Sequence, residues 1–461
     1  MTTFLRLRAA AGSFAAALIS AATTGVLATA CSTASPTGAT IYTGAGNLST
    51  PASIAIVGDG GASAKSFSPP GDPGAGAVYV TISGESNAIT GYPFPPGDWT
   101  NDTYLYDGWQ FVIQEYIVNV DDVTLWANHD TSPTDQSLHG PAVAKLTGPF
   151  VVDLHKGGTI VGQGGAPEEA TPLGSITSQN LNGNAALDPT ASYGFGFSTV
   201  AASYAGYNVN LTPDEFADFA LMVQNGYSVL YVGTATWVVD NSPYGCTQTN
   251  AGSGADAGAP AADGGGASTY GDGGYDFSKM PATMTFRLGF STPTNYVNCQ
   301  NMSRQGIPDP GEDYPRGIQV SPSQSTIAQV TVHMDHPFWE SLAEDSPVHW
   351  DQIAAQYVGA SGVPVARIED MKGVPFYAFT DKTGTPLPWR NCSGAFYTPP
   401  GNGQMFFNPL SVPVNPAETD PSKALRDYYD FIRYSQSTQG HLNSQGLCYI
   451  ARQYPAPPGG S

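Results

Sequence analysis

The 461-residue chain is poor in charged side chains, which make up only 12% of it, and it holds 17 Lys and Arg against 38 Asp and Glu. The formal net charge of −21 therefore reflects a shortage of bases as well as an excess of acids. Such a chain repels polyanions, so we expect no nucleic-acid partner. The same charge balance favours solubility and the attraction of cations.

The sequence also lacks the short motifs that mark common reactions. It has no His-Glu-x-x-His helix, no phosphate loop and no dinucleotide-binding glycines. Residues 84–88, around Ser86, come nearest to a nucleophile elbow. The proline-rich stretch that follows does not predict the helix which that motif requires, so we interpret these residues as a polar turn. The sequence thus names no reaction.

Residues 1–30 predict a signal peptide, because two arginines precede an apolar run rich in Ala, Leu and Val. Cys31 follows directly and predicts a lipid anchor, which would hold the protein at the outer membrane or cell surface. The leucine usual three places before a lipidated cysteine is replaced by Ala28, so an ordinary cleavage that releases a periplasmic or secreted protein is the alternative. Residues 31–75 are rich in Ser, Thr, Gly and Pro and predict a disordered tether.

The chain has five cysteines, which leave an even set once Cys31 is assigned to the lipid. In an exported chain, Cys246, Cys299, Cys392 and Cys448 predict two disulfides. Thiolate ligation of a metal is disfavoured, because no two of them have the short spacing of zinc motifs. Of the three possible connectivities we favour Cys246–Cys299 and Cys392–Cys448, since each pair then lies within one predicted unit.

Repeated short strands between Gly, Pro and Asp loops predict a mostly β fold, an antiparallel β-sandwich over residues 76–336. A Gly-, Ala- and Asp-rich insertion at about residues 248–276 has too little apolar surface to fold. A Thr-Pro-Asp-Glu capping box and a later Asn-Gly predict a helix over residues 212–226. Residues 337–461 hold two helical patterns and predict a small α-rich subdomain that a disulfide staples.

Two of the seven histidines lie where the hydrophobic period changes from that of a strand to that of a helix. The stretch before them alternates like a half-buried strand, and Pro337 suits the first position of a helix. His333, Asp335 and His336 therefore lie at a corner where side chains converge, and His441 follows a second helix. Imidazole suits zinc and copper, so these residues predict a metal site, with Asp335 as a ligand or an orienting carboxylate.

A second interpretation of this corner needs no metal. In it, Asp335 and His336 cap the helix that begins at Pro337, and His333 is a polar residue at the rim of the sheet. The metal interpretation requires the fold to bring His441 to the other two histidines, because the three lie far apart in sequence.

Four stretches together resemble one group of uncharacterised bacterial envelope lipoproteins: Asp107-Gly-Trp109, residues 148–154, His333-Met-Asp-His336 with Phe338, and residues 440–448 from Gly-His to Gly-Leu-Cys. The resemblance spans roughly residues 75–450. It implies a β-sandwich core with a short helical tail and no established activity. The Val-Asp-Leu end of one strand is also similar to the copper-binding partner proteins of di-haem peroxidases, a likeness that transfers no ligand.

Three kinds of function are consistent with these patterns. The first is a non-catalytic envelope protein that binds zinc or copper at the predicted site. The second is a metal-dependent hydrolase or oxidase that uses the same site with Glu340 or Glu344 as general base. The third is a surface adhesion or glycan-binding module with Tyr92, Phe94 and Trp99 in an exposed aromatic patch. We favour the first, because catalytic motifs are lacking.

Overall fold

The computed structural model describes residues 64–96, 105–128, 131–165, 168–238, 246–249, 268–269, 275–339, 348–375, 380–392, 425 and 427–452. All of them belong to one compact unit, Ala62–Ser461. The predicted signal peptide, Cys31 and most of the predicted tether and insertion lie outside these residues. Within them, the helices are all too short or too polar to cross a membrane.

A six-stranded sheet surrounds one pair of parallel strands, β2 (Val78–Ser83) and β16 (Thr326–Val332). On one side of this pair lie β19 (Gly440–Leu442) and β20 (Gly446–Leu447), and on the other β7 (Glu169–Ile176) and β6 (Ile160–Val161). Every residue of β2 is buried, as are the last five of β16. The sheet is therefore covered on both faces.

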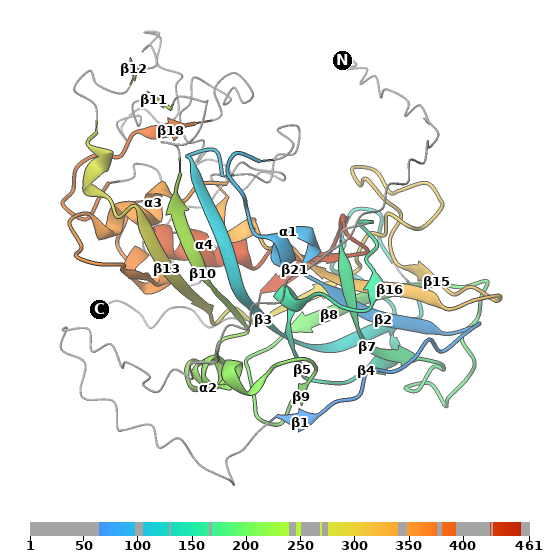
Figure 1. The fold of residues 1–461 in the computed structure, drawn as a ribbon. Helices are drawn as coiled ribbons and strands as arrows, with labels where there is room; N and C mark the ends of the chain where they lie inside the picture. The colour runs from blue at the N-terminus through green and yellow to red at the C-terminus, as the bar shows by residue number, and fades with distance from the viewer. Residues whose placement is uncertain are drawn as a thin grey trace, which may run out of the picture. The chain divides into compact units, whose positions relative to one another are not determined.

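A larger, twelve-stranded sheet is organised by β3 (Trp109–Trp126), the long strand drawn in cyan in Figure 1. Its principal strands are β4 (Ala142–Leu146), β5 (Phe150–Asp153), β8 (Ser192–Thr199), β10 (Val229–Trp237) and β13 (Thr283–Phe290). Shorter members are β1 (Lys65–Ser66), β9 (Tyr207–Asn208), β14 (Thr294–Val297), β15 (Ile318–Gln319), β17 (Val365–Ala366) and β21 (Tyr449–Arg452). A separate small sheet contains β11 (Thr247–Thr249), β12 (Ser268–Thr269) and β18 (Trp389–Asn391).

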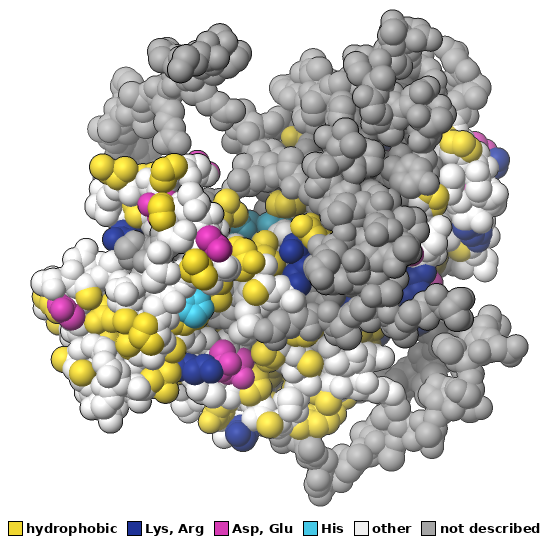
Figure 2. All heavy atoms as spheres, turned by 180° about the vertical axis from the view of Figure 1, so that it is seen from behind, with side chains coloured by type: hydrophobic (Ala, Val, Ile, Leu, Met, Phe, Trp, Pro, Cys, Tyr) yellow, Lys and Arg dark blue, Asp and Glu magenta, His cyan; other side chains and the backbone are white. Residues whose placement is uncertain are grey.

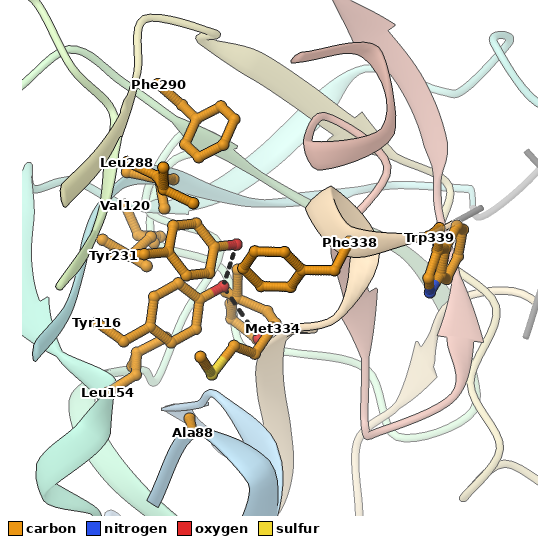
Figure 3. Packing of buried hydrophobic residues seen from close by; sticks show 14 of the residues in the cluster. Ala88, Tyr116, Val120, Leu154, Tyr231, Leu288, Phe290, Met334, Phe338 and Trp339 are labelled. Atoms are coloured by element: carbon orange, nitrogen blue, oxygen red, sulfur yellow. Dashed lines mark hydrogen bonds between the residues drawn. The ribbon is translucent and has the colours of Figure 1, made fainter. Parts of the chain in front are cut away.

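One hydrophobic core contains side chains of both larger sheets, among them Val80 of β2, Val330 of β16 and Val118 of β3. Figure 3 shows part of this core, where the rings of Tyr116 and Tyr231 lie together with their hydroxyl groups facing each other. These hydroxyls are 3.3 Å apart and share a hydrogen bond. The alternating apolar residues of each strand thus pack against the other sheet, as burial of apolar surface requires.

The helices are short. They are α1 (Glu85–Thr90), α2 (Phe216–Asn225), α3 (Asp351–Ala354) and α4 (Tyr428–Gln436), with 3-10 turns η1 (Leu154–Lys156), η2 (Pro213–Glu215), η4 (Phe277–Lys279), η5 (His336–Phe338), η6 (Ala355–Tyr357) and η7 (Ile368–Met371). The predicted capping box is present at η2, and Gly226 ends α2 with φ of 66°. The helix predicted over residues 212–226 is confirmed.

The mostly β fold is confirmed, but the sheets are mixed rather than antiparallel. Parallel pairing joins β1 to β9, β5 to β9, β2 to β16 and β13 to β17. The ordered chain also begins before residue 76, since β1 lies within the predicted tether. After residue 337, β19 pairs with β16 and β21 with β14, so this part of the chain adds strands to both sheets beside its helices. Strands of two to four residues have too little periodicity to be predicted.

The disulfides join Cys246 to Cys392 and Cys299 to Cys448, so the predicted pairing is wrong. Cys246 directly precedes β11, and Cys392 directly follows β18, which pairs with β11 antiparallel. The residues after Cys299 and before Cys448 share a backbone hydrogen bond of 2.8 Å. Long-range strand pairing therefore sets the connectivity, whereas the prediction assumed that each bridge lies within one segment.

Candidate metal centre

The register of three adjacent strands brings distant polar residues to one end of the six-stranded sheet. In the parallel pair β2 and β16, Ser83 lies opposite Thr331. Two residues further on, Glu85 and His333 follow their strands on the same face, because side chains alternate with a period of two. The antiparallel strand β19 places His441 opposite Thr331 as well. The residues therefore converge because of strand pairing.

His333, His336 and His441 are all buried, and each offers a ring nitrogen within 4.8 Å of those of the other two. The rings of His333 and His441 are stacked, with centroids 3.9 Å apart. The ring of His336 stands nearly perpendicular to both, at 5.4 and 5.6 Å. The structure thus brings the three predicted histidines together, and the three could hold one metal ion.

Hydrogen bonds decide which ring nitrogens are left for an ion. Nε2 of His333 lies 3.0 Å from the carbonyl oxygen of Ser444 and 3.3 Å from Oε1 of Glu85. Nδ1 of His336 lies 2.5 Å from Oγ1 of Thr438. The remaining nitrogens, Nδ1 of His333 and Nε2 of His336, are the ones that a metal would use, since a ligating histidine commonly uses its other nitrogen in a hydrogen bond.

Three buried nitrogens of this cluster have no hydrogen-bonding partner among the residues that the structure describes: Nε2 of His336 and both ring nitrogens of His441. The backbone of Gln445 and Thr438 is near enough to favour a charged His441, but neither completes a hydrogen bond by strict geometry. A buried polar atom left unpaired costs about 1–3 kcal/mol. A shared cation would bind Nε2 of His336 and one nitrogen of His441, while the other nitrogen of His441 carries the ring proton.

Burial lowers the pKa of His336 and His441 well below the usual value, and the nearby His333 adds to both shifts. Both rings are therefore neutral at neutral pH, the form that binds metal. For His333, burial also opposes the charged form, but Glu85 and Asp335 outweigh it and raise the pKa. Burial raises the pKa of Glu85 to about 7, against the opposing charge of His333.

Asp335 does not join the histidine cluster. It lies at the N-cap position of η5, but its side chain makes no capping hydrogen bond there, so the capping role of the second interpretation is wrong. Its Oδ2 accepts a hydrogen bond of 2.9 Å from Nε1 of Trp339. The Trp339 ring in turn stacks on His336, with centroids 3.7 Å apart. Figure 3 shows Trp339 on the opposite side of the ribbon from Phe338. Asp335 thus supports a ligand through Trp339, and the helix expected after Pro337 is a single 3-10 turn.

The polar face of β16 is buried, so His333 is not a rim residue. Its neighbours on this face, Gln329 and Thr331, are fully buried, and His333 itself is only 7% exposed. Oε1 of Glu168 accepts a hydrogen bond of 2.5 Å from Nε2 of Gln329, and Oγ1 of Thr331 accepts one of 2.9 Å from the backbone of Ser444. The alternation in sequence identifies a polar face correctly, but a second layer of polar loops covers it.

Sequence analysis did not identify three residues that contact the histidine cluster: Glu85, Ser444 and Thr438. The stretch around Ser86 forms α1 directly after β2, so its interpretation as a turn without a helix is wrong. The residue at the bend is Glu85, with φ of 63°, one position before the serine. The available signal was an acidic residue two positions after the end of the strand β2. It indicates a site only once β2 is known to pair with β16 in parallel.

The other predicted functional residues fall in two groups. Tyr92 and Phe94 are 2% and 7% exposed, which counts against an adhesive patch made of these rings. Trp99, Glu340 and Glu344 lie outside the described residues. On the face drawn in Figure 2, the charged side chains in view are few, and near the lower edge a basic side chain lies beside an acidic one.

No known protein family matches the sequence, and no curated protein or solved structure is significantly similar to it. Functional inference therefore rests on the residues themselves.

Proposed function

We propose that this is an exported, non-catalytic protein of the cell envelope that binds one zinc or copper ion through His333, His336 and His441. The observation that supports it is the set of unpartnered ring nitrogens buried within the cluster. Three neutral imidazoles suit zinc or copper, whereas calcium and magnesium prefer oxygen ligands.

The proposed location rests on different observations. Two disulfides fit an oxidising compartment. The basic and apolar start of the sequence and Cys31 support an outer-membrane or cell-surface lipoprotein, like the group that the chain resembles. A Cys31→Ser variant should then lose its partition into detergent. Unchanged partition would leave a periplasmic or secreted protein.

A metal-dependent enzyme is the second candidate, and the ligand count favours it. Three protein ligands leave one position of a four-coordinate zinc ion for water or substrate, as in catalytic sites. A hydrolase or oxidase would need a base or acceptor beside that position, and the predicted candidates Glu340 and Glu344 lie outside the described chain. We place binding before catalysis because the sequence lacks the short motifs of known catalytic sites.

Metal loading of protein purified without a His tag tests the proposal. Elemental analysis after dialysis should give one zinc or copper ion per chain, and a competition titration should give its affinity. His441→Ala should weaken binding by about 100-fold or more, because it removes one of three ligands. His139→Ala, which truncates an exposed histidine, is the matched control and should have no effect. Absence of bound metal, or equal affinity in both variants, would overturn the proposal.

A further inference from the structure

We propose that Glu85 is a positioning residue of the metal centre, whose carboxylate holds the Nε2–H group of His333 so that Nδ1 faces the ion. This inference rests on the proposed function. It adds a residue that supplies no ligand atom but fixes the tautomer and the orientation of one that does, as carboxylate–histidine–metal arrangements do.

Nε2 of His333 has two acceptors. Oε1 of Glu85 lies 3.3 Å away and the carbonyl oxygen of Ser444 3.0 Å away. A carbonyl oxygen cannot donate, so Nε2 must carry the proton in this contact. The neutral ring then has its lone pair on Nδ1. The two acceptors together select the tautomer that metal binding through Nδ1 requires.

Both acceptors belong to residues with an unusual backbone. Glu85 has φ of 63° and Ser444 has φ of 73°, in the left-handed region that residues other than glycine rarely adopt. Such strain persists where the surrounding structure enforces it, and it is concentrated at functional sites. Here two strained turns, from opposite ends of the chain, meet at one ring nitrogen. That coincidence favours a role for the contact beyond packing.

The turn before Glu85 is tightly constrained. A Cβ atom at Gly84 would lie 2.7 Å from Cβ of Ala88 and 2.9 Å from Cβ of Leu154, so only glycine fits there without a shift of its neighbours. Oγ of Ser83 accepts a hydrogen bond of 2.9 Å from the backbone of Glu85. These contacts hold the carboxylate at the end of β2, level with His333 at the end of β16.

The other nearby carboxylates have different partners. Glu168 accepts from Gln329 and, at 2.8 Å, from the backbone of Gly164, and Asp335 accepts from Trp339. Glu85 has a weak contact of 3.4 Å with Nε2 of Gln445, and the Ser444 hydroxyl lies beside it. An oxygen of Glu85 contacts a predicted ligand, His333, at 3.3 Å.

Glu85→Gln tests the inference, with Glu168→Gln as the matched control. Both changes replace a carboxyl group in the same region and keep its size, although Glu168 is buried and Glu85 only partly so. Loss of a hydrogen-bonding carboxylate behind a ligating histidine costs about 10–100-fold in metal affinity. We expect that loss for Glu85→Gln in a zinc competition titration, with one ion still bound per chain, and a loss below about threefold for Glu168→Gln.

Histidine ¹⁵N spectra of the zinc-loaded wild-type protein and of Glu85→Gln report the protonation of each His333 nitrogen, and loss of the carboxylate should move the Nε2–H signal, which a purely structural role of Glu85 would not. They should show zinc on Nδ1 of His333 and a proton on its Nε2. Zinc on Nε2 would overturn the inference, and this result decides the question even if Glu85→Gln fails to fold.

The titrations separate the two proposals. If His441→Ala abolishes binding while Glu85→Gln binds zinc as tightly as Glu168→Gln does, the positioning role is refuted and the metal site stands. If the wild-type protein binds neither zinc nor copper, the metal site itself is refuted.

Discussion

Two of the polar clusters that the described residues bury differ in how their charges are balanced. The first is the histidine cluster of His333, His336 and His441. The second, which we call the arginine cluster, consists of Asp107, Asp351 and Arg390 with their partners. Nε of Arg390 lies 2.8 Å from Oδ2 of Asp351, and a second guanidinium nitrogen donates to Oδ1 of the same carboxylate. The arginine cluster therefore contains its own cation.

The arginine cluster is held by several hydrogen bonds between residues far apart in sequence. Nε1 of Trp109 donates to Oδ1 of Asp351 at 2.7 Å, and Oδ2 of Asp107 accepts from the backbone of Trp350 at 2.6 Å. Burial and the charge of Asp351 raise the pKa of Asp107 well above its usual value, which favours its neutral form. Asp351 and Arg390 then form a matched ion pair.

The difference indicates which cluster binds a ligand. The cation of the arginine cluster is a side chain, so its charge is balanced within the fold, although Oδ1 of Asp107 is buried without a hydrogen-bonding partner among the described residues. The histidine cluster brings lone pairs together, and the part of the chain that the structure describes places no Lys or Arg among the charges that act on it. Buried donors and acceptors without counterparts are unfavourable unless a ligand pairs them. The arginine cluster is thus structural, and the histidine cluster is suited to a metal.

Asp351→Ala should give the largest effect. It leaves the Arg390 charge buried without its carboxylate, which costs about 3–5 kcal/mol of unfolding free energy. Urea unfolding measures the loss. Lys279→Ala, which breaks the exposed pair with Asp276, is the control and should cost less than about 1 kcal/mol. A similarly small loss for Asp351→Ala would show that the arginine cluster does not stabilise the fold.

Removal of each disulfide should affect the two clusters differently. Removing either one by a double Cys→Ser change should lower the unfolding free energy by about 2–4 kcal/mol. Only the Cys299/Cys448 variant should also weaken zinc binding, because Cys448 follows the β19–β20 hairpin that holds His441. The Cys246/Cys392 variant should bind zinc as the wild type does. Equal zinc affinity in the two variants would show that the Cys299–Cys448 disulfide does not help to hold His441 in the site.

Metal should stabilise the protein through one cluster alone. Zinc at 100 times its dissociation constant raises the unfolding free energy by about 2.7 kcal/mol if it binds only the folded state. Thermal unfolding should show this gain, and a chelator should reverse it. Asp351→Ala should gain as much as the wild type where it folds, whereas His441→Ala should gain nothing. A gain in His441→Ala would place the metal elsewhere.

The pH dependence of stability in the metal-free protein is a further property of the histidine cluster. Because burial lowers the pKa of His336 and His441, the unfolded chain binds more protons than the metal-free native state once the pH falls through about 6.5. Each then costs up to about 1.4 kcal/mol of stability per pH unit of further acidification. His333 acts in the opposite sense, since its raised pKa gives stability that is present below about 6.5 and is lost at higher pH.

Urea unfolding of the metal-free protein between pH 7.5 and 5 measures this slope. His441→Ala should reduce the loss of stability on acidification, because one histidine that must stay neutral in the fold is gone. His139→Ala, at the surface, should leave the slope unchanged. If the slope in His441→Ala equals that of the wild type, His441 is not held neutral by the fold.

Local features could be predicted from the sequence, and long-range ones could not. The capping box before α2 and the alternation along β16 are set by neighbouring residues, and both are present. The ligand types at His333, His336 and His441 follow from imidazole chemistry. The three histidines meet because β16 pairs with β19. A strand of three residues, such as β19, is too short to be predicted from its sequence pattern.

Glu85 and the disulfides show the same limit. Glu85 becomes part of the site only through the parallel pairing of β2 with β16, and the sequence predicted antiparallel strands. The disulfides join distant parts of the chain. Cys246 and Cys392 flank the paired strands β11 and β18. Cys448 follows Leu447, whose carbonyl oxygen accepts a hydrogen bond from the backbone of Gln300, the residue after Cys299. Such partners are fixed by the packing of the whole core, so local patterns do not identify them.

X-ray absorption of the zinc-loaded protein tests the central claim most directly. A site made of His333, His336 and His441 predicts a first shell that contains three imidazole nitrogens at about 2.0–2.1 Å, with the scattering pattern of intact rings. A shell with sulfur at about 2.3 Å, or one of oxygen atoms alone, would contradict it.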